Sequence, residues 1–123
     1  MSILYAEMER AEFERIFQAR YGVRPKLEGL LFLIGLDVLG YWPEGSEKVV
    51  KQDLIALGVW RLLEWKGYAI RRESDAEGWP QFDLCGSLPY QTEEKETDFL
   101  EKAAMSYFAE IWRNLGDAGL RNP

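Results

Sequence analysis

The stretch LEGLLFLIGLDVLGYW, residues 27–42, constrains the fold most, because it is apolar apart from the acids Glu28 and Asp37. A membrane-spanning helix takes about 20 consecutive apolar residues, and these two acids bracket a much shorter run. We therefore expect a buried or interface helix. Pro25 suits its first turn, and Gly40 can end it in a left-handed conformation.

The next stretch, EKVVKQDLIALGVWRLLEWK, is also apolar around most of its helical circumference. Ser46 is expected to cap this helix and Gly67 to end it. Two adjacent helices of this kind need burial on more than one side, so we expect them to form the core. Gly29, Gly35 and Gly58 are predicted to allow close helix crossings, at a cost of about 1 kcal/mol each relative to alanine.

Amphipathic helices are expected near both ends of the chain. The first ends at Gly22, and its apolar stripe consists of Phe13, Ile16, Phe17 and Tyr21. The last is capped by Thr92 and ends at Gly116. Its apolar stripe consists of Leu100, Ala104, Tyr107, Phe108, Ile111 and Leu115. Because each stripe covers one face only, both helices are predicted to pack on the two apolar ones.

Between the third and fourth helices the pattern becomes extended: YAIRRE and QFDLC flank SDAEGWP, which is rich in turn residues. We expect a β-hairpin over about residues 68–85, with Trp79 at its tip and Cys85 buried as a small apolar side chain. The fold class is therefore mainly α, with about four helices in a compact bundle and one short β-hairpin. Residues 1–116 are expected to form a single globular helical domain, and residues 117–123 a flexible C-terminal tail.

The composition excludes several classes of function. With 15 Lys and Arg against 21 Asp and Glu, the net charge of −6 disfavours nucleic acid and anionic membrane surfaces as partners. The absence of His rules out Ser–His and Cys–His nucleophile pairs and the usual zinc and haem ligand sets. Neither a phosphate-binding glycine loop nor a calcium-binding frame is present. We therefore expect no cofactor, metal site or catalytic residue, and the acidic N-terminal segment, unlike a secretory signal, predicts a cytoplasmic protein.

Asp37 is the most informative acid. It lies in the last turn of its expected helix, where the helix dipole disfavours negative charge, and no Lys or Arg stands within four residues of it. In one interpretation Asp37 occupies a narrow solvent-facing strip of a mostly buried helix. In the other it is buried against a distant cation such as Arg61, Lys48 or Arg24.

Tryptophans and acids supply the remaining candidates for ligand or partner contacts. Asp53, Trp60 and Glu64 share one stripe of the third helix, and together with Trp79 they could line a cleft. The alternative is an ion pair of Glu64 with the arginine three residues before it, above a buried Trp60. Trp42, at the bend between the two apolar helices, and Trp79 can each contact a partner or fill the protein's own core.

The segments LLFLIGLDVLG, KQDLIALGVWRLLEWKGYA and EGWPQFDL followed by LPY resemble a small family of uncharacterised bacterial proteins. The resemblance runs from about Pro25 to Tyr90. The shared segments are structural in character and contain no catalytic signature. No activity, cofactor or functional residue is established for that family, so the resemblance implies no site in this chain.

Two functions remain open. The leading hypothesis is a non-enzymatic self-associating or protein-interaction module, because four helices and a ribbon give limited cover to two helices that are apolar nearly all round. A homodimer is then expected, and an unidentified protein partner is also compatible with the pattern. The alternative is a small-molecule binder or carboxylate-dependent enzyme, whose cleft would be lined by Trp60, Trp79, Asp53 and Glu64.

Overall fold

The computed structural model describes residues 9–45 and 47–115. These residues form four helices and a two-stranded antiparallel hairpin, which confirms the predicted mainly α fold class. The elements are α2 (Arg10–Tyr21), α3 (Leu27–Leu39), α4 (Glu47–Trp65), β1 (Ala69–Arg72), β2 (Gln81–Leu84) and α5 (Glu93–Leu115). The predicted cap at Ser46, the helix end at Gly116 and the tail 117–123 lie outside the described residues.

The helix ends follow local sequence signals. Gly22 (φ 77°) and Gly40 (φ 82°) adopt the left-handed conformation and close α2 and α3, each donating its N–H to the carbonyl four residues earlier. Thr92 caps α5 as predicted, because its Oγ1 accepts the N–H of Lys95 at 3.1 Å. Pro25 lies just before α3 and not in its first turn, because the next residue still has an extended backbone.

The helices α3 and α4 approach backbone to backbone at two glycines. A Cβ atom on Gly35 would lie 2.0 Å from the carbonyl oxygen of Leu54, and one on Gly58 would lie 2.1 Å from that of Leu31. No larger residue fits at either position unless a helix moves, so the predicted close crossing is confirmed for both. The prediction is wrong for Gly29: no atom of another element lies within 4 Å of its Cβ position, because this part of α3 faces away from α4.

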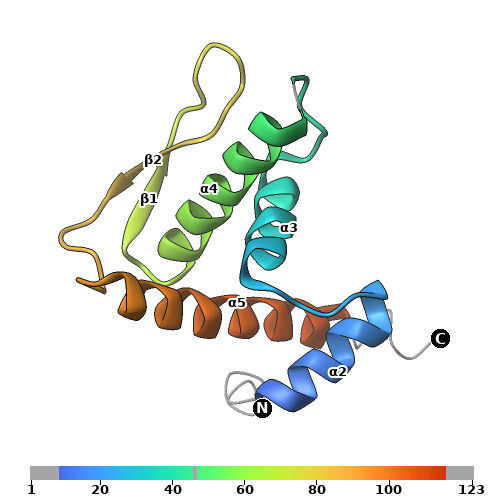
Figure 1. Cartoon of the computed structure of the whole chain (residues 1–123). Coiled ribbons are helices and arrows are strands. Elements are labelled where there is room, and N and C mark those ends of the chain that lie inside the picture. Colours follow the sequence, from blue (N-terminus) through green and yellow to red (C-terminus); the bar gives the residue numbers. More distant parts are fainter. Residues whose placement is uncertain (1–8, 46, 116–123) are drawn as a thin grey trace.

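Figure 1 shows the hairpin, α4 and α3 side by side in that order, with α5 running across their lower ends. The helix α5 contacts both α3 and α4, and α2 packs against α5. The helix α3 thus forms an outer edge of the arrangement beyond α4, although Trp79 and Phe82 of the hairpin reach the same apolar cluster as Leu39 of α3.

Buried apolar side chains form two clusters. The larger one, named the α5 core here, joins α5 to the other three helices. Its buried members are Phe13, Phe17, Leu30, Leu31, Ile34, Leu62, Leu100, Ala103, Ala104, Tyr107, Phe108 and Trp112. The smaller one, named the hairpin core, lies where α3, α4 and the hairpin meet. Its buried members are Leu39, Val50, Leu54 and Leu57.

The apolar stripe predicted for α5 is confirmed over most of its length. Its buried members are Leu100, Ala104, Tyr107 and Phe108. Towards the C-terminal end Ile111 is only half-buried and Leu115 is exposed, whereas Trp112, which the stripe did not include, is buried. The ring of Trp112 stacks on that of Phe13 with centroids 5.2 Å apart. The buried side of α5 therefore turns towards α2 at this end.

The hairpin pairs β1 with β2 in antiparallel register, with Ala69 opposite Leu84. The carboxylate of Asp75 holds its turn by accepting two backbone N–H groups, each at 2.9 Å. Cys85 is exposed, so the prediction of a buried thiol is wrong. Side chains alternate between the two sides of a strand, and Cys85 lies two residues after Asp83 on the outward side.

Candidate functional site

One side of the hairpin packs on α4 through stacked side chains. The rings of Phe82 and Trp60 lie within 5° of parallel with centroids 5.7 Å apart. The guanidinium carbon of Arg71, which is directly opposite Phe82 in the register, lies 5.3 Å from the Phe82 ring centroid. The hairpin therefore covers one face of the Trp60 ring, which is half-buried.

Glu64 is the centre of an ionic network beside this stack. Its Oε1 accepts hydrogen bonds from Arg61 and Arg71, each at 3.0 Å, so the predicted ion pair with Arg61 is present. The Nε of Arg61 also donates to the hydroxyl of Tyr107 at 3.2 Å. Burial lowers the pKa of Arg61, but its interactions with Tyr107 and Glu64 outweigh this effect and raise the pKa above its ordinary value. One carboxylate thus binds two permanent cations, an arrangement that fastens the hairpin to α4.

Of the four residues predicted to line a cleft, Trp60 and Glu64 lie beside the same hairpin stack, but the four do not form a paired-acid site. Trp79 is half-buried and packs against the hairpin core, where it fills the protein's own interior. Asp53 is exposed, and it lies eleven residues (64 − 53) from Glu64 along α4. That spacing corresponds to about 16 Å along the helix axis, beyond the roughly 5–10 Å over which two carboxylates act together. The arrangement does not favour a carboxylate-dependent enzyme.

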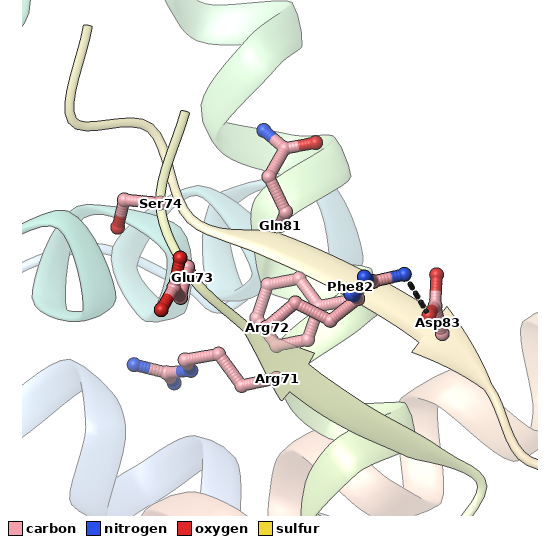
Figure 2. Close-up of a pocket in the computed structure, with 7 residues that line it drawn as sticks. All are labelled: Arg71, Arg72, Glu73, Ser74, Gln81, Phe82 and Asp83. Atoms are coloured by element: carbon pink, nitrogen blue, oxygen red, sulfur yellow. Dashed lines mark hydrogen bonds and ion pairs between the residues drawn. The ribbon is translucent and has the colours of Figure 1, made fainter. Parts of the chain in front are cut away.

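Figure 2 shows an open hollow on the hairpin, which is lined by Arg71, Arg72, Glu73, Ser74, Gln81, Phe82 and Asp83. Arg72 reaches across to Asp83 at 2.7 Å, whereas Arg71 points away from that pair and binds Glu64. Each arginine already has an acidic partner, so neither is free to bind an anion. The hollow is therefore no built ligand site.

Asp37 is exposed, in line with the solvent-facing interpretation, and the interpretation that buries it against a cation is wrong. The reason is the helix crossing: Gly35 faces α4, and two further residues turn the chain by about 200° around the helix axis. Asp37 therefore points away from α4. Arg61, one of the cations considered for it, is bound to Glu64 and Tyr107 instead.

One side of α3, between the crossing with α4 and the edge marked by Asp37, is apolar. Helical geometry places Gly29, Leu33 and Leu36 on this side, with Phe32 at its margin. The three large side chains are half-buried, and Trp42, which follows α3, is 57% exposed. Its ring contacts the ring of Phe32 edge to face with centroids 5.9 Å apart. We call these five residues the α3 outer face.

Sequence reasoning singled out Trp42 and the neighbouring Asp37 but missed Phe32, Leu33 and Leu36 as outward residues. The helix α3 is apolar on nearly all sides, so its pattern of residues does not distinguish inward from outward positions. The signal that could have found the face is the pair Gly35 and Gly58. Once these glycines mark the crossing, the residues half a turn away must point outward.

Comparison with family models, curated proteins and solved structures finds no match to this chain. The resemblance to uncharacterised bacterial proteins therefore stays an interpretation. None of the helices within residues 9–45 and 47–115 is both long and apolar enough to cross a membrane. In the same part of the chain, no group of three or more Cys, Asp or Glu side chains is placed to hold a metal ion.

Proposed function

We propose that this protein is a non-enzymatic protein-interaction module that docks through the α3 outer face. The observation that carries the proposal is the apolar outward side of α3, which lies at the margin of the fold and ends in the exposed ring of Trp42. Tryptophan is one of the residue types that most often dominate the binding energy of an interface.

The α3 outer face is held in place by the fold. Phe32 and Leu36 pack partly against the hairpin core, and Leu33 packs partly against the α5 core. Each side chain therefore keeps an exposed part while its conformation is fixed from behind. A preformed apolar surface loses little conformational entropy on binding, and burial gains roughly 25 cal/mol for each Å² removed from water.

Charged residues lie at the edges of the α3 outer face. Lys26, Glu28 and Asp37 are all exposed on α3 or at its start. An apolar centre with a polar rim is the usual anatomy of a protein–protein interface. The charges give the surface a means to select and orient its partner.

The test compares two arginine substitutions at exposed helix positions. Gly29→Arg places a charge in the α3 outer face, where the open space around Gly29 accepts a side chain. Ala56→Arg places the same charge on the exposed side of α4 and is the matched control. Each tagged variant is co-expressed with an untagged wild-type copy in the cells that produce the protein. Recovered partners are identified by mass spectrometry and titrated in purified form.

We expect Gly29→Arg to weaken binding of the identified partner at least about tenfold, because a buried unpaired charge is costly, and Ala56→Arg to leave it unchanged. Thermal unfolding of both variants separates lost binding from lost folding. A partner that binds the Gly29→Arg variant as tightly as the wild type would contradict the proposal. The failure of every recovered partner to bind in purified form would contradict it as well.

A further inference from the structure

We propose that the partner on the α3 outer face is a second copy of this chain, with the two α3 helices antiparallel across a two-fold axis near Leu31 and Phe32. This inference rests on the proposed docking surface and adds the identity and orientation of the partner. It is carried by two exposed charges at opposite ends of α3, Lys26 and Asp37, and by the open space at Gly29.

Lys26 and Asp37 lie on the same edge of the α3 outer face. They are eleven residues (37 − 26) apart, and both are exposed. Eleven residues at about 100° each exceed three full turns by about 20° and extend about 16 Å along the axis. The two charges are therefore nearly aligned on one side of the helix, one at each end.

An antiparallel two-fold pairing brings these opposite charges together. An axis midway between positions 26 and 37 sets Lys26 of one copy level with Asp37 of the partner subunit, on the same edge of the interface. The symmetry repeats this pair at the other end. A parallel two-fold pairing would instead put the two Lys26 side chains, and likewise the two Asp37 side chains, on opposite edges of the interface, so neither charge would gain a partner of opposite sign. Charge complementarity therefore selects the antiparallel orientation.

The same axis places apolar side chains of the partner subunit beside the open space at Gly29. With the axis between positions 31 and 32, Leu33 and Leu36 of the partner subunit lie level with positions 30 and 27, on either side of Gly29. Apart from the adjoining backbone of α3 and the two neighbouring residues, no described atom lies within 4 Å of the Gly29 Cβ position. Apolar side chains of the second helix can therefore enter this space, as knobs enter holes between paired helices.

The pairing also supplies Asp37 with a cation. Asp37 lies in the last turn of α3, where the helix dipole disfavours negative charge. Within its own chain, Lys26 borders a small hollow together with the acids Glu14 and Glu101. Glu101 already has a cationic partner, because it pairs with Arg10 at 3.3 Å. Because each copy carries a net charge of −6, association needs local attraction of this kind to offset the overall repulsion.

Charge exchange between the two positions tests the arrangement. In Lys26→Asp alone, acids face acids at both ends of the interface, and in Asp37→Lys alone, lysines face lysines. A one-to-one mixture of these two variants restores an attractive pair at each end. We expect each variant alone to dimerise at least about tenfold more weakly than the wild type, as measured by sedimentation. Native mass spectrometry of the mixture should show the heterodimer as the dominant dimer.

Two further proteins complete the experiment. The double variant Lys26→Asp with Asp37→Lys should regain the wild-type dimer affinity, because both pairs are present in reversed order. Lys51→Asp makes the same change of charge as Lys26→Asp at an exposed position of α4, and it should leave dimerisation unchanged. All of these side chains are exposed, so the substitutions leave the cores intact.

The outcomes separate this inference from the docking surface itself. A mixture in which the heterodimer is no more abundant than random pairing predicts would overturn the antiparallel arrangement. A wild-type chain that stays monomeric up to about 100 µM, a generous limit for a specific dimer, would overturn the second copy as partner. The Gly29→Arg experiment would then still test the surface with another protein. A dimer that tolerates Gly29→Arg would contradict both proposals.

Discussion

The two cores of the molecule are built differently. The α5 core contains an aromatic cluster: the rings of Phe13, Phe108 and Trp112 contact one another with centroids 5.2 to 6.4 Å apart, and helices surround them. The buried members of the hairpin core are all aliphatic, and half-buried Trp79 and Phe82 close it from the hairpin. One core is closed by a long helix, and the other by a ribbon with two short strands.

This difference explains where apolar surface stays exposed. A hairpin of two strands is only marginally stable by itself. The inward side of this hairpin packs on α4 through Phe82 and Arg71. The hairpin leaves the far side of α3 uncovered. Phe32 and Leu36 consequently face the hairpin core on one side and solvent on the other. The less completely covered core is the one beside the docking surface.

Truncation of a ring in the α5 core should have the largest effect. Phe108 is 5% exposed and contacts both Phe13 and Trp112. We expect Phe108→Ala to lower the free energy of unfolding by about 3–5 kcal/mol, through lost burial and the cavity left behind. Urea denaturation followed by far-ultraviolet circular dichroism measures the change. A loss below about 1 kcal/mol would show that this core is not the principal source of stability.

The helix crossing should come next, because it connects the two cores. In Gly58→Ala the new Cβ would meet the carbonyl oxygen of Leu31 at 2.1 Å, so α3 and α4 must separate. We expect a loss of about 2–3 kcal/mol, at the upper end for overpacking, because the obstacle is backbone. Gly29→Ala is the control: with open space around it, it should be neutral or stabilising by up to about 1 kcal/mol. If Gly58→Ala and Gly29→Ala lowered the free energy of unfolding equally, the idea that glycine sets the distance between α3 and α4 would be refuted.

In the hairpin core the effect should be smaller and local. Phe82→Ala removes the ring that covers Trp60, and we expect a loss of about 1–2 kcal/mol because the ring is only half-buried. Hydrogen exchange should accelerate in β1 and β2 while α5 keeps its protection. Ile70→Ala, on the exposed outward side of β1, is the matched control and should leave exchange unchanged. Equal acceleration in α5 would mean that the two cores unfold as one unit.

The smallest effect is expected on the outward side of the hairpin. Arg72 and Asp83 form an ion pair at 2.7 Å, but their side chains are 63% and 51% exposed. We expect Arg72→Gln to change the free energy of unfolding by less than about 0.5 kcal/mol. Arg71→Gln, which breaks the contact with Glu64 on the inward side, should cost about 1 kcal/mol. If thermal unfolding showed a larger loss for Arg72→Gln than for Arg71→Gln, the side of the hairpin that packs on α4 would be the one that carries Arg72.

The sequence predicts features that depend on a few neighbouring residues. Gly22 and Gly40 end their helices and Thr92 caps α5 because backbone conformation and capping are local. Gly29 and Gly35 look alike in sequence, yet only Gly35 lies at the crossing, because that role depends on where α4 passes. The direction in which a residue faces is decided by distant parts of the chain.

The same distinction applies to the candidate site. Trp42 and Asp37 are unusual in their local setting, so the sequence marks them individually. Lys26, Leu33 and Leu36 are ordinary residues for the start or the interior of an apolar helix, and nothing local marks them. They form a surface with the first two only because Gly35 fixes which side of α3 meets α4.

The stacking of Phe13 on Trp112 joins opposite ends of the described chain, and this has a consequence for synthesis on the ribosome. The apolar side of α2 emerges early, but the rings of α5 that it packs against are made last. The helices α3 and α4 are neighbours in sequence, so they can close their glycine crossing while the rest of the chain is still being translated. We therefore expect this helix pair to be the first unit that folds during synthesis, so that the outward surface of α3 forms before the α5 core.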